Sequence, residues 1–198
     1  MTVIFSQGSG DADPVAAADA LAHFGWASHL NGEERTERYF KHALEVDPDN
    51  VFAHVFWANL YLSAYNYPMD RDNLMEAKSH YAMAMQSKRY AMYKKYVNDV
   101  MLLTFLYTGH DGADIEGIKF ANTLRKSHYQ IEDQLRRYVL YKWSDRVLCN
   151  DDRNEQLVKA VLPDELLATF AWLTKDLEIP NLDLELMQKR LVQLTGRK

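Results

Sequence analysis

Short turn motifs divide this sequence into segments whose apolar residues recur every three or four positions, and this pattern constrains the fold more than any other feature. Asp13-Pro14 places a capping residue before a proline, the usual start of a helix, and Asn31-Gly32 provides a stop signal. Another break, DPDN, follows at 47–50. Because the 198 residues include only eight Gly and five Pro, and no segment alternates with period two, the sequence predicts helices and no sheet.

The spacing predicts about ten helices, and the short connections between them favour antiparallel hairpins. The expected ranges are 14–30, 33–47, 50–66, 72–88, 90–108, 113–127, 130–148, 154–162, 163–178 and 184–194. Residues 1–12 are rich in Gly, Ser and Asp and are expected to form a loose tail. The expected all-α chain therefore has three parts: this tail, a set of hairpins over 13–128, and C-terminal helices over 129–198.

A motif repeats in the first two pairs of segments. The first pair carries LxxFG and then TxxxF, and the second carries HxxWA and then AxxxY. Each pair has a small residue, Gly25 or Ala58, where two helices can approach closely, and these residues are 33 positions apart. Together with the linker ALEVDPDN at 43–50, this pattern resembles the tetratricopeptide repeat (TPR) family, whose period is about 34 residues.

The resemblance is strong over 14–88 and weaker beyond it. The second pair has extra residues around 67–72 and carries Arg89 in place of the family's terminal proline. Over 90–128 the nearest match is Gly117-x3-Ala121, and beyond 129 no motif is present. The resemblance implies a right-handed superhelix of antiparallel helical hairpins. The C-terminal helices are expected to pack on this superhelix or to cap its end.

The resemblance also implies a binding surface, because the first helix of each TPR hairpin lines the concave face that binds peptides in this family. By alignment this face is aromatic and weakly polar, which suits an apolar or amphipathic segment. The candidate binding residues are Trp26, His29, Phe52, Val55, Phe56, Asn59, Tyr93, Lys94 and Asn98. The same rings have an alternative role as packing residues in the core. Lys94 and Asn98 resemble half of the carboxylate clamp of TPR domains that bind chaperone C-termini, but the first helix lacks the matching Lys and Asn.

We therefore expect a protein-binding adaptor or chaperone and no enzyme activity. One alternative is a structural subunit of an oligomer, including a homodimer, that uses the long helix over 130–148 and the C-terminal helices as its interface. The last helix carries an apolar stripe that either caps the end of the solenoid or pairs with another chain. That stripe consists of Leu184, Met187, Leu191 and Leu194. Another alternative is a small helical Mg²⁺-dependent enzyme that uses Asp151, Asp152 and Glu155, although acidic residues at a helix start also favour the helix dipole.

Composition argues against several other classes. The net charge is −5 without a basic block, which disfavours nucleic acid as a partner. The single cysteine, Cys149, excludes an internal disulfide, and no metal-binding or cofactor-binding motif is present, so we expect neither metal nor cofactor. No apolar run is long enough for a membrane span and no signal peptide precedes residue 13, so the expected location is cytoplasmic.

Overall fold

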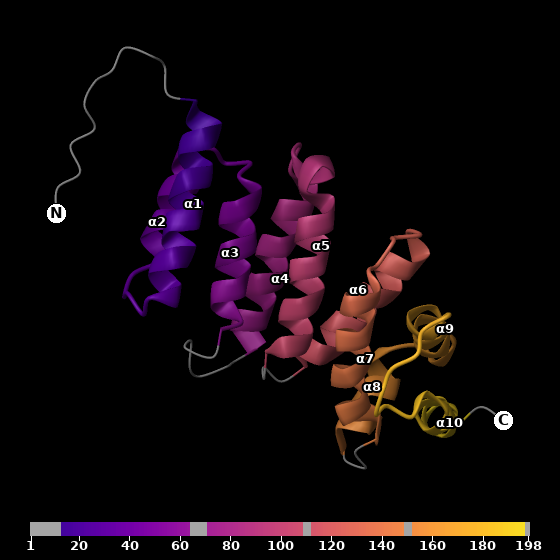
Figure 1. Ribbon diagram of the computed structural model, residues 1–198. Helices are drawn as coiled ribbons and strands as arrows, with labels where there is room; N and C mark the ends of the chain where they lie inside the picture. The colour runs from indigo at the N-terminus through magenta and orange to yellow at the C-terminus, as the bar shows by residue number, and fades with distance from the viewer. Residues whose placement is uncertain (1–12, 64–70, 109–111, 149–151, 197–198) are drawn as a thin grey trace. The chain divides into compact units, whose positions relative to one another are not determined.

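The protein is described by a computed structural model that covers residues 13–63, 71–108, 112–148 and 152–196 (Figure 1). These residues form ten α-helices and no strand, which confirms the predicted all-α class. The helices are α1 Pro14–Leu30, α2 Glu37–Val46, α3 Val51–Tyr61, α4 Arg71–Gln86, α5 Tyr90–Tyr107, α6 Ala113–Lys126, α7 Asp133–Leu148, α8 Asp152–Ala160, α9 Pro163–Thr174 and α10 Leu184–Leu194. The predicted tail over 1–12 and Cys149 lie outside the described residues.

The helix boundaries follow local chemistry. The Asp13 side chain accepts a hydrogen bond from the Val15 amide at 3.0 Å and so caps α1 as expected. The second helix begins at Glu37, four residues later than predicted, because Arg35 adopts a positive φ of 64° that a right-handed helix excludes. Helix α9 ends at Thr174, earlier than the predicted 178. Asp176, just beyond this end, has a φ of 54°, which a right-handed helix excludes.

The chain divides into two compact units. Unit 1 comprises Met1–Leu60 and Ala77–Tyr93, and unit 2 comprises Tyr61–Glu76 and Lys94–Lys198. Unit 1 thus holds α1, α2, most of α3, the second part of α4 and the start of α5. Unit 2 holds the rest of α5 and all of α6 to α10.

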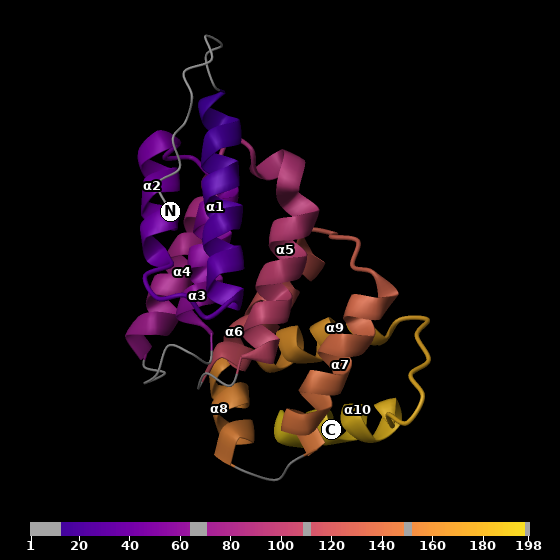
Figure 2. The same cartoon turned by 60° about the vertical axis from the view of Figure 1, so that its left-hand side comes forward.

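In unit 1, α1 and α2 lie side by side (Figure 2). A Cβ atom added to Gly25 would stand 2.8 Å from Tyr39 Cβ and 2.9 Å from Phe40 Cε1, which is closer than real contacts allow. Phe40 is fully buried at this point. The expected close approach at Gly25 is therefore present, and only glycine fits it.

Helices α3 and α4 also contact each other in unit 1. The Tyr81 hydroxyl donates a hydrogen bond to Asn59 Oδ1 at 2.5 Å, and the Trp57 ring stacks on His80 with centroids 4.7 Å apart. Ala58 of α3 and Ala77 of α4 are both fully buried.

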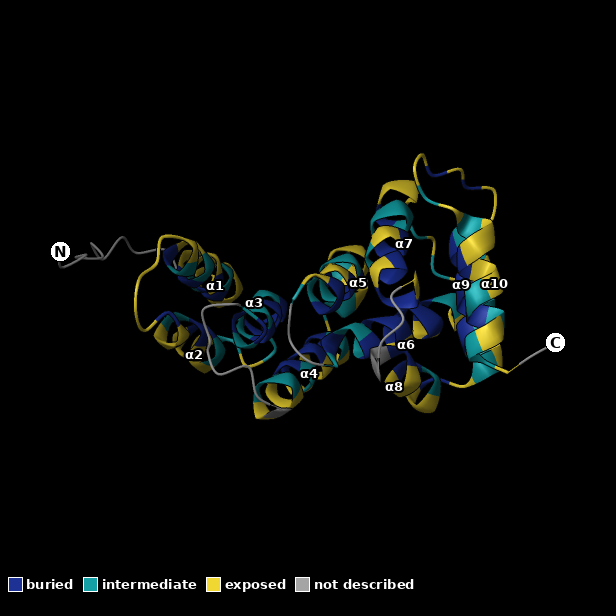
Figure 3. Cartoon of the chain, turned by 90° about the horizontal axis from the view of Figure 1, so that it is seen from below, coloured by how far each residue is buried: buried dark blue, intermediate teal, exposed yellow. Residues whose placement is uncertain are grey.

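Unit 2 has its own core, and exposed and buried residues alternate along its helices (Figure 3). Trp143 of α7 is buried edge-on against Phe170 of α9, with centroids 5.9 Å apart. Met187 and Leu191 of α10 are fully buried, and α10 contacts α7, α8 and α9. The apolar stripe of the last helix is therefore covered largely within its own unit. No helix in the described ranges combines the length and apolar character that crossing a membrane would need.

Candidate peptide-binding surface

Four aromatic side chains from three helices form a continuous series in unit 1, which we call the aromatic row. It consists of Trp26 from α1, Phe56 and Phe52 from α3, and Tyr93 from α5. The Trp26 and Phe56 rings stack with centroids 5.5 Å apart, Phe56 and Phe52 are 6.2 Å apart, and Phe52 and Tyr93 are 4.7 Å apart. All four are predicted site residues, and the structure brings them together although they span residues 26 to 93.

Two histidines extend the aromatic row. The His23 ring lies 4.6 Å from Phe52 and 5.2 Å from Phe56, and the His29 ring lies 5.2 Å from Trp26. Burial lowers the pKa of His29 below its usual value, which favours the neutral ring at pH 7. Next to Trp26 the row therefore offers a second aromatic ring, that of His29, whose neutral form suits apolar recognition.

The aromatic row lies at the edge of the core. Phe56 is only 4% exposed and contacts Phe40 behind it, with centroids 6.4 Å apart. Trp26, Phe52 and Tyr93 are each half-buried, so part of every ring remains accessible to solvent. Phe56 is therefore mainly a packing residue of the core. Trp26, Phe52 and Tyr93 keep some surface that a partner could contact.

The remaining predicted site residues are not part of the aromatic row. Val55 is fully buried, so it supports α3 from within the unit. Asn59 accepts the hydrogen bond from Tyr81 that joins α3 to α4. Lys94 and Asn98 belong to unit 2, where Lys94 is exposed and Asn98 is 1% exposed, so Asn98 offers almost no surface for the carboxylate clamp that the sequence partly resembles.

An ionic cluster ties together the elements that carry the aromatic row. Arg89 lies 2.7 Å from Asp47 and 3.3 Å from Asp19, and the Asn50 amide donates to Asp19 at 2.6 Å. The Ser87 hydroxyl also donates to the Asp49 carbonyl at 2.9 Å. These contacts join α1, the turn between α2 and α3, and the turn between α4 and α5. Arg89, which replaces the family's proline, thus makes long-range contacts that the sequence pattern did not reveal.

A buried histidine pair lies between α3 and α4. The Nδ1 atoms of His54 and His80 are 3.0 Å apart, so one ring must donate and the other accept. Burial lowers the pKa of both rings, and the nearby His54 contributes to lowering the pKa of His80 to about 4. His54 is the first residue of the HxxWA motif and is only 6% exposed, and its pairing with His80 is visible only in the structure.

The magnesium alternative needs acidic side chains that are placed together to hold a metal ion. Over these ranges, no group of three or more His, Cys, Asp or Glu residues is placed to hold a metal ion. Of the acidic residues considered for magnesium, Glu155 pairs with Lys159 at 2.7 Å. Asp151 and the side chain of Asp152 lie outside the described residues.

Comparisons with family models, curated proteins and solved structures find no match to this chain.

Proposed function

We propose that this chain is a protein-binding helical-repeat protein, an adaptor or chaperone, that holds an apolar or amphipathic segment of a partner protein on the aromatic row. The observation that carries the proposal is the continuity of the row. Trp26, Phe52 and Tyr93 come from three different helices, each is half-buried, and Phe56 joins Trp26 to Phe52. Large aromatic side chains with accessible faces are the residues that most often dominate protein interfaces.

The proposed architecture is a run of TPR-like hairpins over 13–128 that coils as a right-handed superhelix. Its support is local. Gly25 allows α2 to approach α1 in unit 1, and Gly117 lies within 3.0 Å of the Leu106 side chain in unit 2, measured from an added Cβ. Ala58 is fully buried at the equivalent position of α3. Small residues at these points are what close helical hairpins need.

Burial of apolar surface is the proposed driving force. Covering the exposed parts of three rings with apolar side chains removes that surface from water, at about 25 cal/mol for each Å². The ionic cluster around Arg89 is expected to hold the row in place before binding, which lowers the entropy cost of association. Catalysis is not required for this activity.

The oligomer alternative stays a prediction. In the apolar stripe of the last helix, Met187 and Leu191 are fully buried in unit 2, so these two residues are not exposed for a second copy of the chain. A partner segment on the aromatic row is therefore the better-supported proposal.

The test uses peptides selected from a random library on the full chain and measured by fluorescence anisotropy against single variants. We expect Trp26→Ala and Phe52→Ala to weaken binding by about tenfold or more, since interface aromatics contribute that much. The matched control is Phe24→Ala, which removes a 55% exposed ring of α1 that faces Tyr39 of α2. If the selected peptides bind Trp26→Ala and Phe52→Ala as tightly as the unmodified chain, the aromatic row is not the binding surface.

A further inference from the structure

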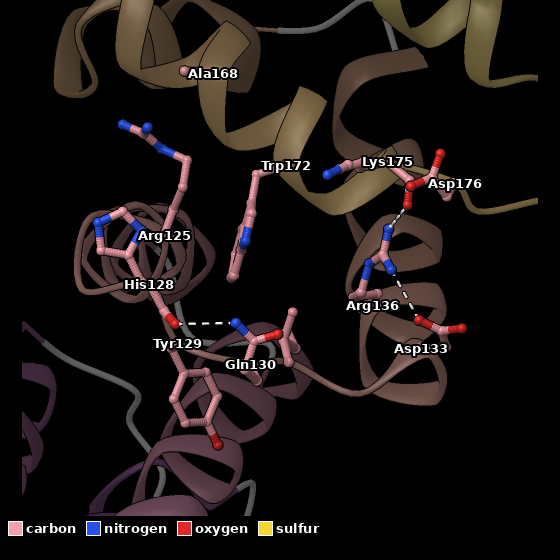
Figure 4. A pocket seen from close by; sticks show the side chains of 11 residues that line it. Arg125, His128, Tyr129, Gln130, Asp133, Arg136, Ala168, Trp172, Lys175 and Asp176 are labelled. Carbon is pink, nitrogen blue, oxygen red and sulfur yellow. Dashed lines mark hydrogen bonds and ion pairs between the residues drawn. The ribbon is translucent and has the colours of Figure 1, made fainter.

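Unit 2 contains a cavity of about 630 Å³ that is separate from the aromatic row. It is lined by the ends of α6 and α9, the segment between α6 and α7, and the start of α7 (Figure 4). We call it the α6–α9 pocket. Its volume is in the range of sites for small molecules, about 300 to 1,000 Å³.

Trp172 of α9 provides the main apolar surface of the α6–α9 pocket. Its side chain is half-buried, and Figure 4 shows the indole between Arg125 and His128 on one side and Lys175 on the other. An indole with an open face stacks planar groups and contacts cations. The pocket therefore has an aromatic platform with positive groups on both sides.

The positive groups near Trp172 are only partly used by the protein. Among the described residues, neither the Lys175 ammonium nor the His128 imidazole has a hydrogen bond or an ion pair. Arg125 donates from Nε and Nη2 to Asn122 Oδ1 at 3.2 and 2.9 Å, which fixes the guanidinium, and within the described chain its Nη1 remains available. Thr169 also donates to Asn122 Oδ1 at 3.2 Å, which anchors this arrangement to α9.

The acidic residues of the pocket are directed elsewhere. Asp133 accepts a hydrogen bond from Arg136 Nη1 at 2.8 Å, and Asp176 lies on the side away from Trp172 (Figure 4). Arg136 also donates to the carbonyl oxygens of Leu173 and Lys175, so it holds the end of α9 in position. The lining has three permanent cations, Arg125, Arg136 and Lys175, against the two acids Asp133 and Asp176, so one negative charge would balance it.

Two residues at the rim of the pocket have a left-handed backbone conformation although neither is a glycine. His128 and Asp176 both line the α6–α9 pocket and have φ values of 55° and 54°. At such helix ends glycine is the usual residue because a side chain makes the left-handed conformation unfavourable. Side chains held in this conformation are enriched at functional sites, and two such residues flank the same cavity.

We propose that the α6–α9 pocket binds an aromatic group that bears a carboxylate, stacked on Trp172 with the carboxylate paired to Lys175. This chemistry has two sources, a free aromatic acid or the C-terminal aromatic residue of a peptide. The proposal is independent of the aromatic row, because all of the pocket residues belong to unit 2.

The test is calorimetric titration of the full chain with naphthoate and with its neutral analogue naphthalenemethanol. We expect saturable binding of naphthoate, and binding about tenfold weaker for the neutral analogue and for Lys175→Gln, since a charge-assisted contact contributes about that factor. Trp172→Leu is expected to weaken naphthoate binding by a similar factor, with circular dichroism to check the fold. Lys189→Gln, the same charge change on an exposed residue of α10, is the matched control and should bind as the unmodified chain does.

Two further probes distinguish the sources. An acetylated tripeptide that ends in Phe is compared with the same tripeptide as its C-terminal amide. Tighter binding of the free-acid tripeptide than of naphthoate identifies a peptide C-terminus, and the reverse order identifies a free aromatic acid. The proposal is overturned if neither acid binds below about 1 mM, if the neutral analogue or the amide binds as well as its acid, or if Lys175→Gln has no effect.

Discussion

Trp26 of α1 and Phe56 of α3 stack almost in parallel, with ring centroids 5.5 Å apart and an angle of 9° between the planes. The two rings differ in burial, since Phe56 is 4% exposed and Trp26 is half-buried. This contact therefore joins the core of unit 1 to its surface. It also gives the two residues different expected roles in stability and in binding.

The first prediction separates these roles. Phe56→Ala should lower the free energy of unfolding by about 3 to 5 kcal/mol because it leaves a cavity beside Phe40, whereas Trp26→Ala should cost about 2 kcal/mol or less. Urea denaturation followed by circular dichroism measures both. Equal losses for the two variants would show that Trp26 is as much a core residue as Phe56.

The second prediction concerns the close approach of α1 and α2. Gly25→Ala improves helix propensity by about 1 kcal/mol, but the new methyl would meet Tyr39 Cβ at 2.8 Å and Phe40 Cε1 at 2.9 Å. We expect net destabilisation of about 1 to 3 kcal/mol from overpacking, measured by thermal or urea unfolding. Ala27→Gly, at an exposed site of the same helix, is the comparison and should cost only about 0.5 to 1 kcal/mol. A more stable Gly25→Ala variant would contradict the close approach.

The third prediction is a pH dependence from the buried histidine pair. The folded chain holds the pKa of His80 at about 4, below the ordinary value of about 6.5 that applies when the chain is unfolded. Between these values the unfolded chain binds more protons, so the contribution to stability is complete above pH 6.5 and is lost as the pH falls toward 4. Discounting the shift for partial solvent access, the loss is on the order of 2 kcal/mol.

Urea midpoints at several pH values test this dependence, and His80→Gln serves as the control. The variant removes the group that titrates, so it should show a smaller change in stability between pH 6.5 and 4 than the unmodified chain. Unchanged curves for the variant would assign the pH dependence to other groups.

The fourth prediction concerns the ionic cluster. Arg89 contacts Asp47 at 2.7 Å and Asp19 at 3.3 Å, and all three side chains are largely shielded from solvent. Arg89→Gln should therefore cost about 1 to 2 kcal/mol because both carboxylates lose their cation. A double-mutant cycle with Asp47→Asn should give a coupling of about 1 kcal/mol that decreases in high salt. Additive effects would show that the ion pair contributes no stability.

Local sequence patterns predicted the helices well because helix formation depends on residues three and four positions apart. Two of the boundary errors lie next to a residue with a positive φ, Arg35 before the start of α2 and Asp176 after the end of α9. Neither is a glycine or an asparagine, so composition gave no signal. The repeat pattern also predicted that Trp26, Phe56 and Tyr93 share one face, and the structure places their helices α1, α3 and α5 so that the rings lie in one series.

Long-range polar contacts were not predictable in the same way. Asp19 and Arg89 are 70 residues apart, and His54 and His80 are 26 residues apart in different helices. No local periodicity links such pairs. The α6–α9 pocket was missed for the same reason, since it is formed by the ends of three helices in a region without a repeat motif.

The most direct test of the proposed function is an NMR titration of the indole N–H signals with a library-selected peptide. Trp26→Phe assigns the Trp26 signal among the four tryptophans of the chain. We predict that the Trp26 signal shifts progressively and saturates as peptide is added, while the signal of the buried Trp143 in unit 2 stays in place. Saturable binding that leaves the Trp26 signal unmoved would contradict recognition at the aromatic row.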